Sequence, residues 1–186
     1  ILTAHEPRIR ACAVMSVCHE PGGETIFQQA SPTFKKRFMY MSGMTDEAEF
    51  DAARKIYNGM FDRRPAMIAR CLGAADVVRS VQFARAHGLL VAVRGGGHSL
   101  SGQSVCDDGL MIDLAPMRAV RVDPSRRLAR AGGGALLGDL DRETLAFGLV
   151  TTTGTVSHTG AGGLTLGGGF GRLARRYGLT CDQLTS

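Results

Sequence analysis

A histidine directly follows three consecutive glycines at the end of a short apolar run, within residues 91–99. Glycine has no Cβ atom, so successive glycines let the backbone turn several N–H groups toward one point, where they bind an anion. The preceding apolar run is typical of a strand, and a strand would deliver the imidazole of His98 to a fixed place beside that point. The pattern predicts a loop that binds a phosphorylated ligand and touches it through His98.

A second glycine-dense segment occupies residues 151–171. Each glycine loses much backbone entropy when it becomes ordered, so this density needs a reason other than packing. Residues 169–174 match the G-x-G-x-x-A pattern of dinucleotide loops, but that site also needs a preceding strand and an acidic residue about 20 residues later. Only twelve residues follow Ala174, and no G-x-x-x-x-G-K-[ST] sequence occurs. Neither a Rossmann site nor a P-loop is therefore predicted.

The remaining alternative is one site built from two separate glycine loops, residues 94–99 and 159–169, that close on one elongated ligand. Taken alone, a histidine after a glycine loop, such as His98, is more often a packed or hydrogen-bonding residue than a catalytic one. His158 stands next to the second loop, and a structural and a functional role for it are both open.

Taken together, the two loops resemble those of the FAD-linked oxidases of the vanillyl-alcohol oxidase and berberine bridge enzyme group. The resemblance covers the chain from about Asp46 to its end. It is carried by R-G-G-G-H-S at 94–99, T-G-A-G-G-L-T-L-G-G-G at 159–169 and Y-G-L-T-C-D at 177–182, with M-I-D-L at 111–114 and G-D-L at 138–140 between them.

The resemblance implies an α+β fold, an FAD-binding domain of two small β-sheets with flanking helices that is C-terminally incomplete in this chain. It also implies that FAD lies extended, with its pyrophosphate against the two loops. The cofactor-binding residues that it implies are Arg94, Gly95, Gly96, Gly97, His98, Ser99, Thr159, Gly160, Gly162, Gly163, Thr165 and Gly169.

Within this resemblance, His98 is the residue that bonds covalently to the 8α-methyl group of the flavin. Some members add a second bond through a cysteine shortly before the second loop. Val156 stands at or near that place, and no cysteine lies between Cys106 and Cys181. A single covalent bond, through His98, is therefore expected.

The function implied by the resemblance is that of an FAD-dependent oxidoreductase. In the intact enzyme, a C–H bond of an alcohol, sugar or amine substrate would deliver hydride to the flavin, and dioxygen would reoxidise the flavin and yield hydrogen peroxide. The chain is expected to stop before the substrate-binding domain of full members and to be silent alone, and no catalytic residue is assigned. The alternative is a non-catalytic or truncated flavin-binding fragment without turnover.

Composition limits the partners of the chain. Of its 186 residues, 44% are hydrophobic, and its net charge of +5 suits anionic ligands. Aromatic residues make up 6%, with no Trp and no aromatic stripe among the arginines, so a nucleic-acid partner is not predicted. No apolar run reaches the roughly 18 residues that span a bilayer, and no secretory signal is recognisable. We expect a small-molecule substrate and dioxygen as partners, no membrane association and a cytoplasmic location.

The five cysteines form no C-x-x-C pair, so neither a disulfide framework nor a metal site is predicted, and each cysteine is expected to be a small buried residue. They are Cys12, Cys18, Cys71, Cys106 and Cys181.

Residues 1–43 show neither helical nor strand periodicity, so a poorly ordered or unrelated segment is predicted there. The FAD-binding domain is predicted at 44–186. A helix is expected to start near Thr45 and to keep an apolar face as far as Met60. Strands are expected at 66–71, 89–93 and 110–114, and a hairpin at 120–122 and 128–131. Further helices are expected at 73–87, with Val77, Val78, Val81 and Ala84 on one face and Gly88 closing it, and at 136–147.

Overall fold

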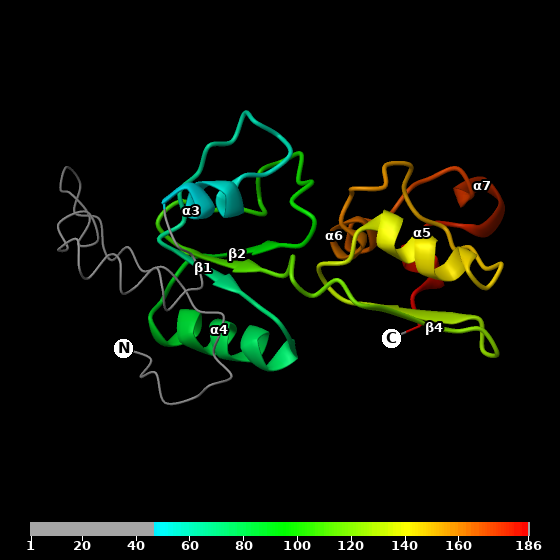
Figure 1. Cartoon of the computed structure of the whole chain (residues 1–186). Helices are drawn as coiled ribbons and strands as arrows, with labels where there is room; N and C mark the ends of the chain where they lie inside the picture. The colour runs from blue at the N-terminus through cyan, green and yellow to red at the C-terminus, as the bar shows by residue number, and fades with distance from the viewer. Residues whose placement is uncertain (1–46, 186) are drawn as a thin grey trace. The chain divides into compact units, whose positions relative to one another are not determined.

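The computed structural model describes residues 47–185 (Figure 1). They form two compact units, which we treat separately. One consists of Ile1–Arg94, described from residue 47, and Leu100–Asp113; the other consists of Gly95–Ser99 and Leu114–Ser186, described up to residue 185. The predicted segment 1–43 and the predicted helix start at Thr45 lie outside the described residues.

The first unit is built on a three-stranded parallel sheet. Its strands are β1 (Met67–Arg70), β2 (Val91–Arg94) and β3 (Leu110–Asp113), in the order β1-β3-β2. All four residues of the central strand β3 are buried, as expected of a strand with a neighbour on each side and a helix on each face. The three predicted strands are thereby confirmed.

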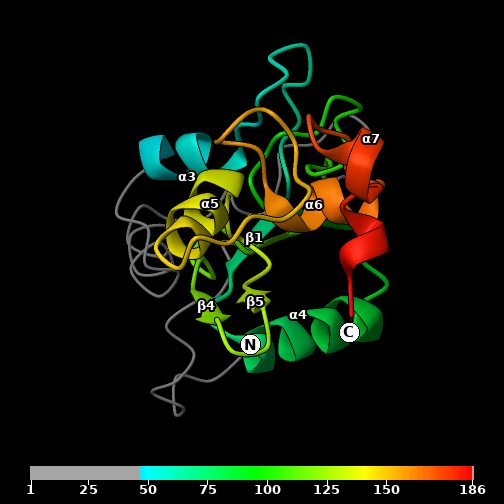
Figure 2. The ribbon, with the colours of Figure 1, turned by 90° about the vertical axis from the view of Figure 1, so that its right-hand side faces the viewer.

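Two helices flank this sheet, α3 (Glu47–Arg54) and α4 (Ala74–Ala86), on opposite faces (Figures 1 and 2). The first helix was expected to keep an apolar face as far as Met60, but α3 ends at Arg54. Tyr57 and Met60, beyond its end, are exposed. The buried guanidinium of Arg54 bonds Asp62 and the carbonyl oxygen of Arg63, so the chain turns back around it instead of continuing the helix. The α3 side of the core is formed by Phe50, Ala53, Ile56, Ile68, Val105 and Met111.

The predicted apolar face of α4 is partly wrong. Ser80 and Ala84 are buried, whereas Val78 and Val81 are about half exposed. Ser80 can be buried because its hydroxyl donates a hydrogen bond to the carbonyl oxygen of Asp76, 2.8 Å away. Gly88 adopts a φ of +63° just beyond the helix, as predicted for its end.

The second unit contains a two-stranded antiparallel hairpin, β4 (Val120–Asp123) and β5 (Leu128–Ala131), as predicted. The helix α5 (Leu137–Leu145) packs against the hairpin, in agreement with the helix expected at 136–147 (Figure 2). Two short helices, α6 (Ala161–Leu166) and α7 (Ala174–Tyr177), and a 3₁₀ turn at Cys181–Gln183 complete this unit. With these elements, the chain has the predicted α+β architecture of two small sheets with flanking helices.

The free cysteines behave differently from one another. Cys71 and Cys106 are buried, as predicted, and burial raises the pKa of the Cys106 thiol. The prediction is wrong for Cys181, which is the first residue of the 3₁₀ turn and is exposed. Cys12 and Cys18 lie outside the described residues. Among residues 47–185, no helix is long and apolar enough to cross a membrane.

Candidate functional site

The start of the first glycine loop is held by charges at the end of the parallel sheet. Arg70, Asp113 and Arg94 are register partners at the ends of β1, β3 and β2. The carboxylate of the buried Asp113 lies 3.3 Å from Nη1 of Arg94 and 3.7 Å from Nε of Arg70. Arg94 also donates to the carbonyl oxygen of Lys55. Arg94, which was predicted to bind the cofactor, stands directly before the glycines. These contacts, all within its own unit, hold it in place.

Within the second unit, the two predicted glycine loops are in direct backbone contact. A Cβ atom added to Gly96 would lie 2.5 Å from the nitrogen of Gly160, and one added to Gly160 would lie 2.5 Å from the nitrogen of Gly96. Real Cβ atoms do not approach backbone so closely, so both residues must be glycine for the loops to meet. The sequence predicted that these two loops close on one ligand, and the structure shows that they are in contact.

A third glycine run, Gly132-Gly133-Gly134, completes this contact. The carbonyl oxygen of Gly133 would lie 3.0 Å from a Cβ atom at Gly95 and 3.2 Å from one at Gly162. Gly133 thereby touches both loops. The signal in the sequence was the triplet Gly132-Gly133-Gly134 itself, but a triplet does not say which other segments it meets.

The second loop is anchored by the first turn of α5. The N–H groups of Leu137 and Gly138 donate to the carbonyl oxygens of Thr159 and Ser157, at 2.9 and 2.8 Å. N–H groups at the start of a helix have no partner within the helix, so the loop satisfies them and is held in place.

Asp139 fixes the same turn of α5 from its other side. Its buried carboxylate accepts a hydrogen bond from the N–H of Leu136 at 3.0 Å and two from the guanidinium of Arg118 at 2.9 and 2.7 Å. The Arg118 guanidinium holds the pKa of the Asp139 carboxyl below its ordinary value. Because Arg118 lies just before β4, this charge pair ties the hairpin to the helix that carries the second loop.

The other predicted site residues differ in what surrounds them. Gly97 has a φ of +69°, which favours glycine. Gly169 has a φ of +75°, its carbonyl oxygen accepts two hydrogen bonds from Thr180, and a Cβ atom there would clash with that side chain. The Thr165 hydroxyl donates to the carbonyl oxygen of Ala161 at 2.7 Å. At Gly163, by contrast, no described atom outside its chain neighbours and the backbone of its own helix lies within 4 Å of an added Cβ atom.

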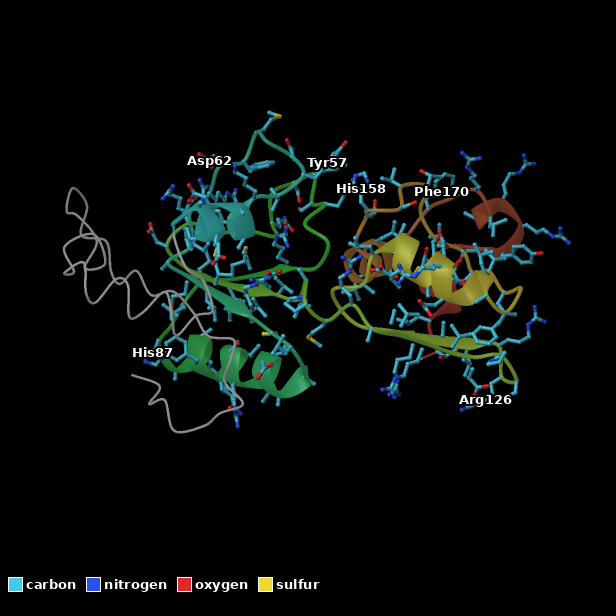
Figure 3. The ribbon with its side chains drawn as sticks, in the orientation of Figure 1. Tyr57, Asp62, His87, Arg126, His158 and Phe170 are labelled. Carbon is cyan, nitrogen blue, oxygen red and sulfur yellow. The ribbon has the colours of Figure 1, made fainter. Side chains whose placement is uncertain are left out.

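The two histidines of the second unit lie in contact. The ring centroids of His98 and His158 are 4.9 Å apart, and the ring planes are tilted by 52°. The Nε2 atom of His98 is buried. His158 is exposed on the loop that leads into α6, where Figure 3 labels it. The contact joins the histidine of the first loop to the one beside the second.

These features define a class of site: glycine loops that meet backbone to backbone, with a half-buried imidazole beside them. The FAD binding domain family matches residues 65–186, which is more than half of the chain. An (R)-6-hydroxynicotine oxidase from Paenarthrobacter nicotinovorans is 42% identical over 139 residues, covering 75% of this chain and 30% of the relative.

Solved structures agree with this match. A 6-hydroxy-D-nicotine oxidase from Arthrobacter nicotinovorans superposes with a TM-score of 0.72 at 43% identity, over 74% of this chain and 30% of that one. A glucooligosaccharide oxidase from Acremonium strictum is described with a 6-S-cysteinyl, 8α-N1-histidyl FAD. It superposes with a TM-score of 0.65 at 31% identity, over 74% of this chain and 29% of that one.

The chain belongs to the FAD-linked oxidase family of the vanillyl-alcohol oxidase and berberine bridge enzyme group, and it contains part of that family's FAD-binding domain. It spans about 30% of the length of the relatives that it matches.

The residues present fit the cofactor of this family. A diphosphate needs N–H donors and a surface without side chains. In the described part of the chain, the N–H group of the half-buried Gly96 donates to no backbone carbonyl, so it is free of a backbone acceptor and can serve a phosphate oxygen. The space beside Gly163 is open.

Proposed function

We propose that the chain is the FAD-binding part of a flavin-dependent oxidoreductase. The observation that carries this proposal is the backbone contact between Gly96 and Gly160, which joins the two loops into one surface and sets His98 beside it. The match to FAD-linked oxidases supports the identity of the ligand. The loops 95–99 and 159–163 would hold the diphosphate through backbone N–H groups, which need no side chain to become ordered on binding.

When bound by these loops, FAD would supply the redox chemistry: a hydride acceptor for a substrate C–H bond, with dioxygen as the final electron acceptor and hydrogen peroxide as its product. The protein's part is to orient the cofactor. Gly163 leaves room for a phosphate beside α6, while Asp139 and Arg118 hold the turn of α5 to which the second loop is bonded. The relatives include oxidases named for a nicotine derivative and for oligosaccharides, so an amine, alcohol or sugar is the substrate class that we propose.

His98 is the covalent attachment point in this proposal, and the only one. A neutral imidazole nitrogen is a nucleophile, and His98 is the histidine that follows the first glycine loop. A relative carries its flavin on a histidine and a cysteine. Here the residue at or near the place of that cysteine is Val156, which cannot form such a bond.

The test is a visible spectrum of the purified chain, followed by acid denaturation. We expect flavin absorption at about 450 nm, a property of the cofactor, and flavin that stays on the denatured polypeptide. In His98→Ala, the flavin should bind but leave on denaturation. A chain without flavin absorption would refute the FAD site, and flavin retained by His98→Ala would refute the attachment. Peroxide production with amines, alcohols and sugars separates an oxidase from a flavin-binding fragment without turnover.

A further inference from the structure

The contact between the imidazoles of His98 and His158 is not a by-product of core packing. His158 is exposed, so no surrounding core forces its ring onto that of His98. A centroid separation of 4.9 Å with a tilt of 52° lies within the range that aromatic rings prefer when they attract each other.

The backbone on both sides of this contact is fixed. Ser157 and Thr159, the neighbours of His158, accept hydrogen bonds from the first turn of α5, and the N–H of Thr159 donates to the carbonyl oxygen of Val156 at 3.0 Å. On the other side, Gly96 is packed against Gly160. With both backbones held, rotation about the side-chain bonds is the main freedom left to the His98 ring, and the His158 ring restricts it.

We propose that His158 is a positioning residue for His98, whose ring contact orients the His98 imidazole for its reaction with the flavin. This inference rests on the proposed function, in which His98 is the attachment point. In the reaction, an imidazole nitrogen of His98 forms a bond to the 8α carbon. One imidazole N–H bond and one C–H bond of that methyl group break, and dioxygen takes up the two protons and two electrons as hydrogen peroxide.

If His158 orients the His98 imidazole, its removal should change the rate of covalent attachment and not the affinity for FAD. A misplacement of about 1 Å can slow a reaction by about 100-fold. We therefore expect His158→Ala to slow covalent attachment at saturating FAD by at least about tenfold, with little change in the FAD concentration that gives half the maximal rate. His158→Phe keeps a ring at this place and should stay within about threefold of the parent.

The experiment uses the full chain produced under riboflavin limitation, so that it has not yet acquired flavin, and mixed with FAD in air. Samples are denatured in acid at intervals, and the flavin bound to the polypeptide is measured over a series of FAD concentrations. His87→Ala is the matched control, because His87 is an exposed histidine at the end of α4 whose ring contacts Phe83. Should His158→Ala fail to fold by circular dichroism, His158→Leu replaces it as the variant without a ring.

The inference is overturned if the variants without a ring attach flavin as fast as the parent, or if His158→Phe is as slow as they are. It is also overturned if the only change is weaker FAD binding, since His158 would then be part of the binding surface. Failure of the proposed function looks different. In that case the parent chain itself binds no FAD, or His98→Ala still retains flavin after denaturation.

Discussion

Gly96 and Gly163 provide the sharpest test of what the glycines of this site do, because the structure gives them opposite surroundings. A Cβ atom at Gly96 would lie 2.5 and 2.6 Å from the nitrogen and Cα of Gly160 and 2.9 Å from Cδ2 of Leu136. Two of these three atoms are backbone and cannot rotate away. A Cβ atom at Gly163 would meet no described atom within 4 Å other than its chain neighbours and the backbone of α6 itself.

These surroundings predict opposite effects on stability. Overpacking a well-packed place costs about 1–3 kcal/mol, and we expect Gly96→Ala to reach the upper end, about 3 kcal/mol, because the obstacle is backbone. Gly163 lies inside α6, where alanine is favoured over glycine by about 0.5–1 kcal/mol. We expect Gly163→Ala to be as stable as the parent or slightly more so, yet to bind FAD at least about tenfold more weakly, a loss of about 1.4 kcal/mol.

The measurements are urea unfolding followed by circular dichroism, and FAD titration of the folded proteins. A free energy of unfolding for Gly96→Ala within about 0.5 kcal/mol of the parent would refute the loop contact. Unchanged FAD affinity in Gly163→Ala would show that the open space beside this residue is not where the cofactor lies. Neither residue has a positive φ, so backbone strain does not complicate the comparison.

Three further predictions concern the framework of the second unit. Asp139→Asn should lower the free energy of unfolding at pH 7 by about 1–2 kcal/mol. Because the folded-state pKa of this carboxyl is lowered, the extra stability of the parent is present above about pH 4 and is lost as the pH falls further. Urea unfolding of both proteins across this pH range would show it. Gly169→Ala should be destabilised by about 2 kcal/mol or more, through its positive φ and the clash with Thr180, and Thr180→Gly should recover part of that loss in the double variant. Arg121→Glu should stabilise the hairpin by about 0.2–1 kcal/mol at low salt, since Arg121 is the direct cross-strand partner of Arg130; an equal gain at high salt would contradict a charge effect.

The sequence by itself determined the local elements and the family to which the chain belongs. Short apolar runs next to glycine and proline turns mark the strands, and strand periodicity depends on near neighbours alone. The R-G-G-G-H-S string and the second glycine loop were sufficient to indicate an FAD-linked oxidase. These are local patterns, and a local pattern keeps its meaning wherever the segment lies.

The tertiary structure alone decided which residues meet. The role of Gly133, the contact of His98 with His158 and the pairing of Asp139 with Arg118 each join segments far apart in the sequence. A sequence that is read for periodicity contains no such information.

The same limit explains the errors in burial. Ser80 is buried and Val81 exposed because the orientation of α4 over the sheet and the hydrogen bond within the helix decide burial, and hydrophobicity alone does not. The sequence does not distinguish Gly163 from Gly96, because each is a glycine within a glycine-rich loop. Only the atoms packed around them show that one glycine closes the contact between two loops and that the other has open space beside it.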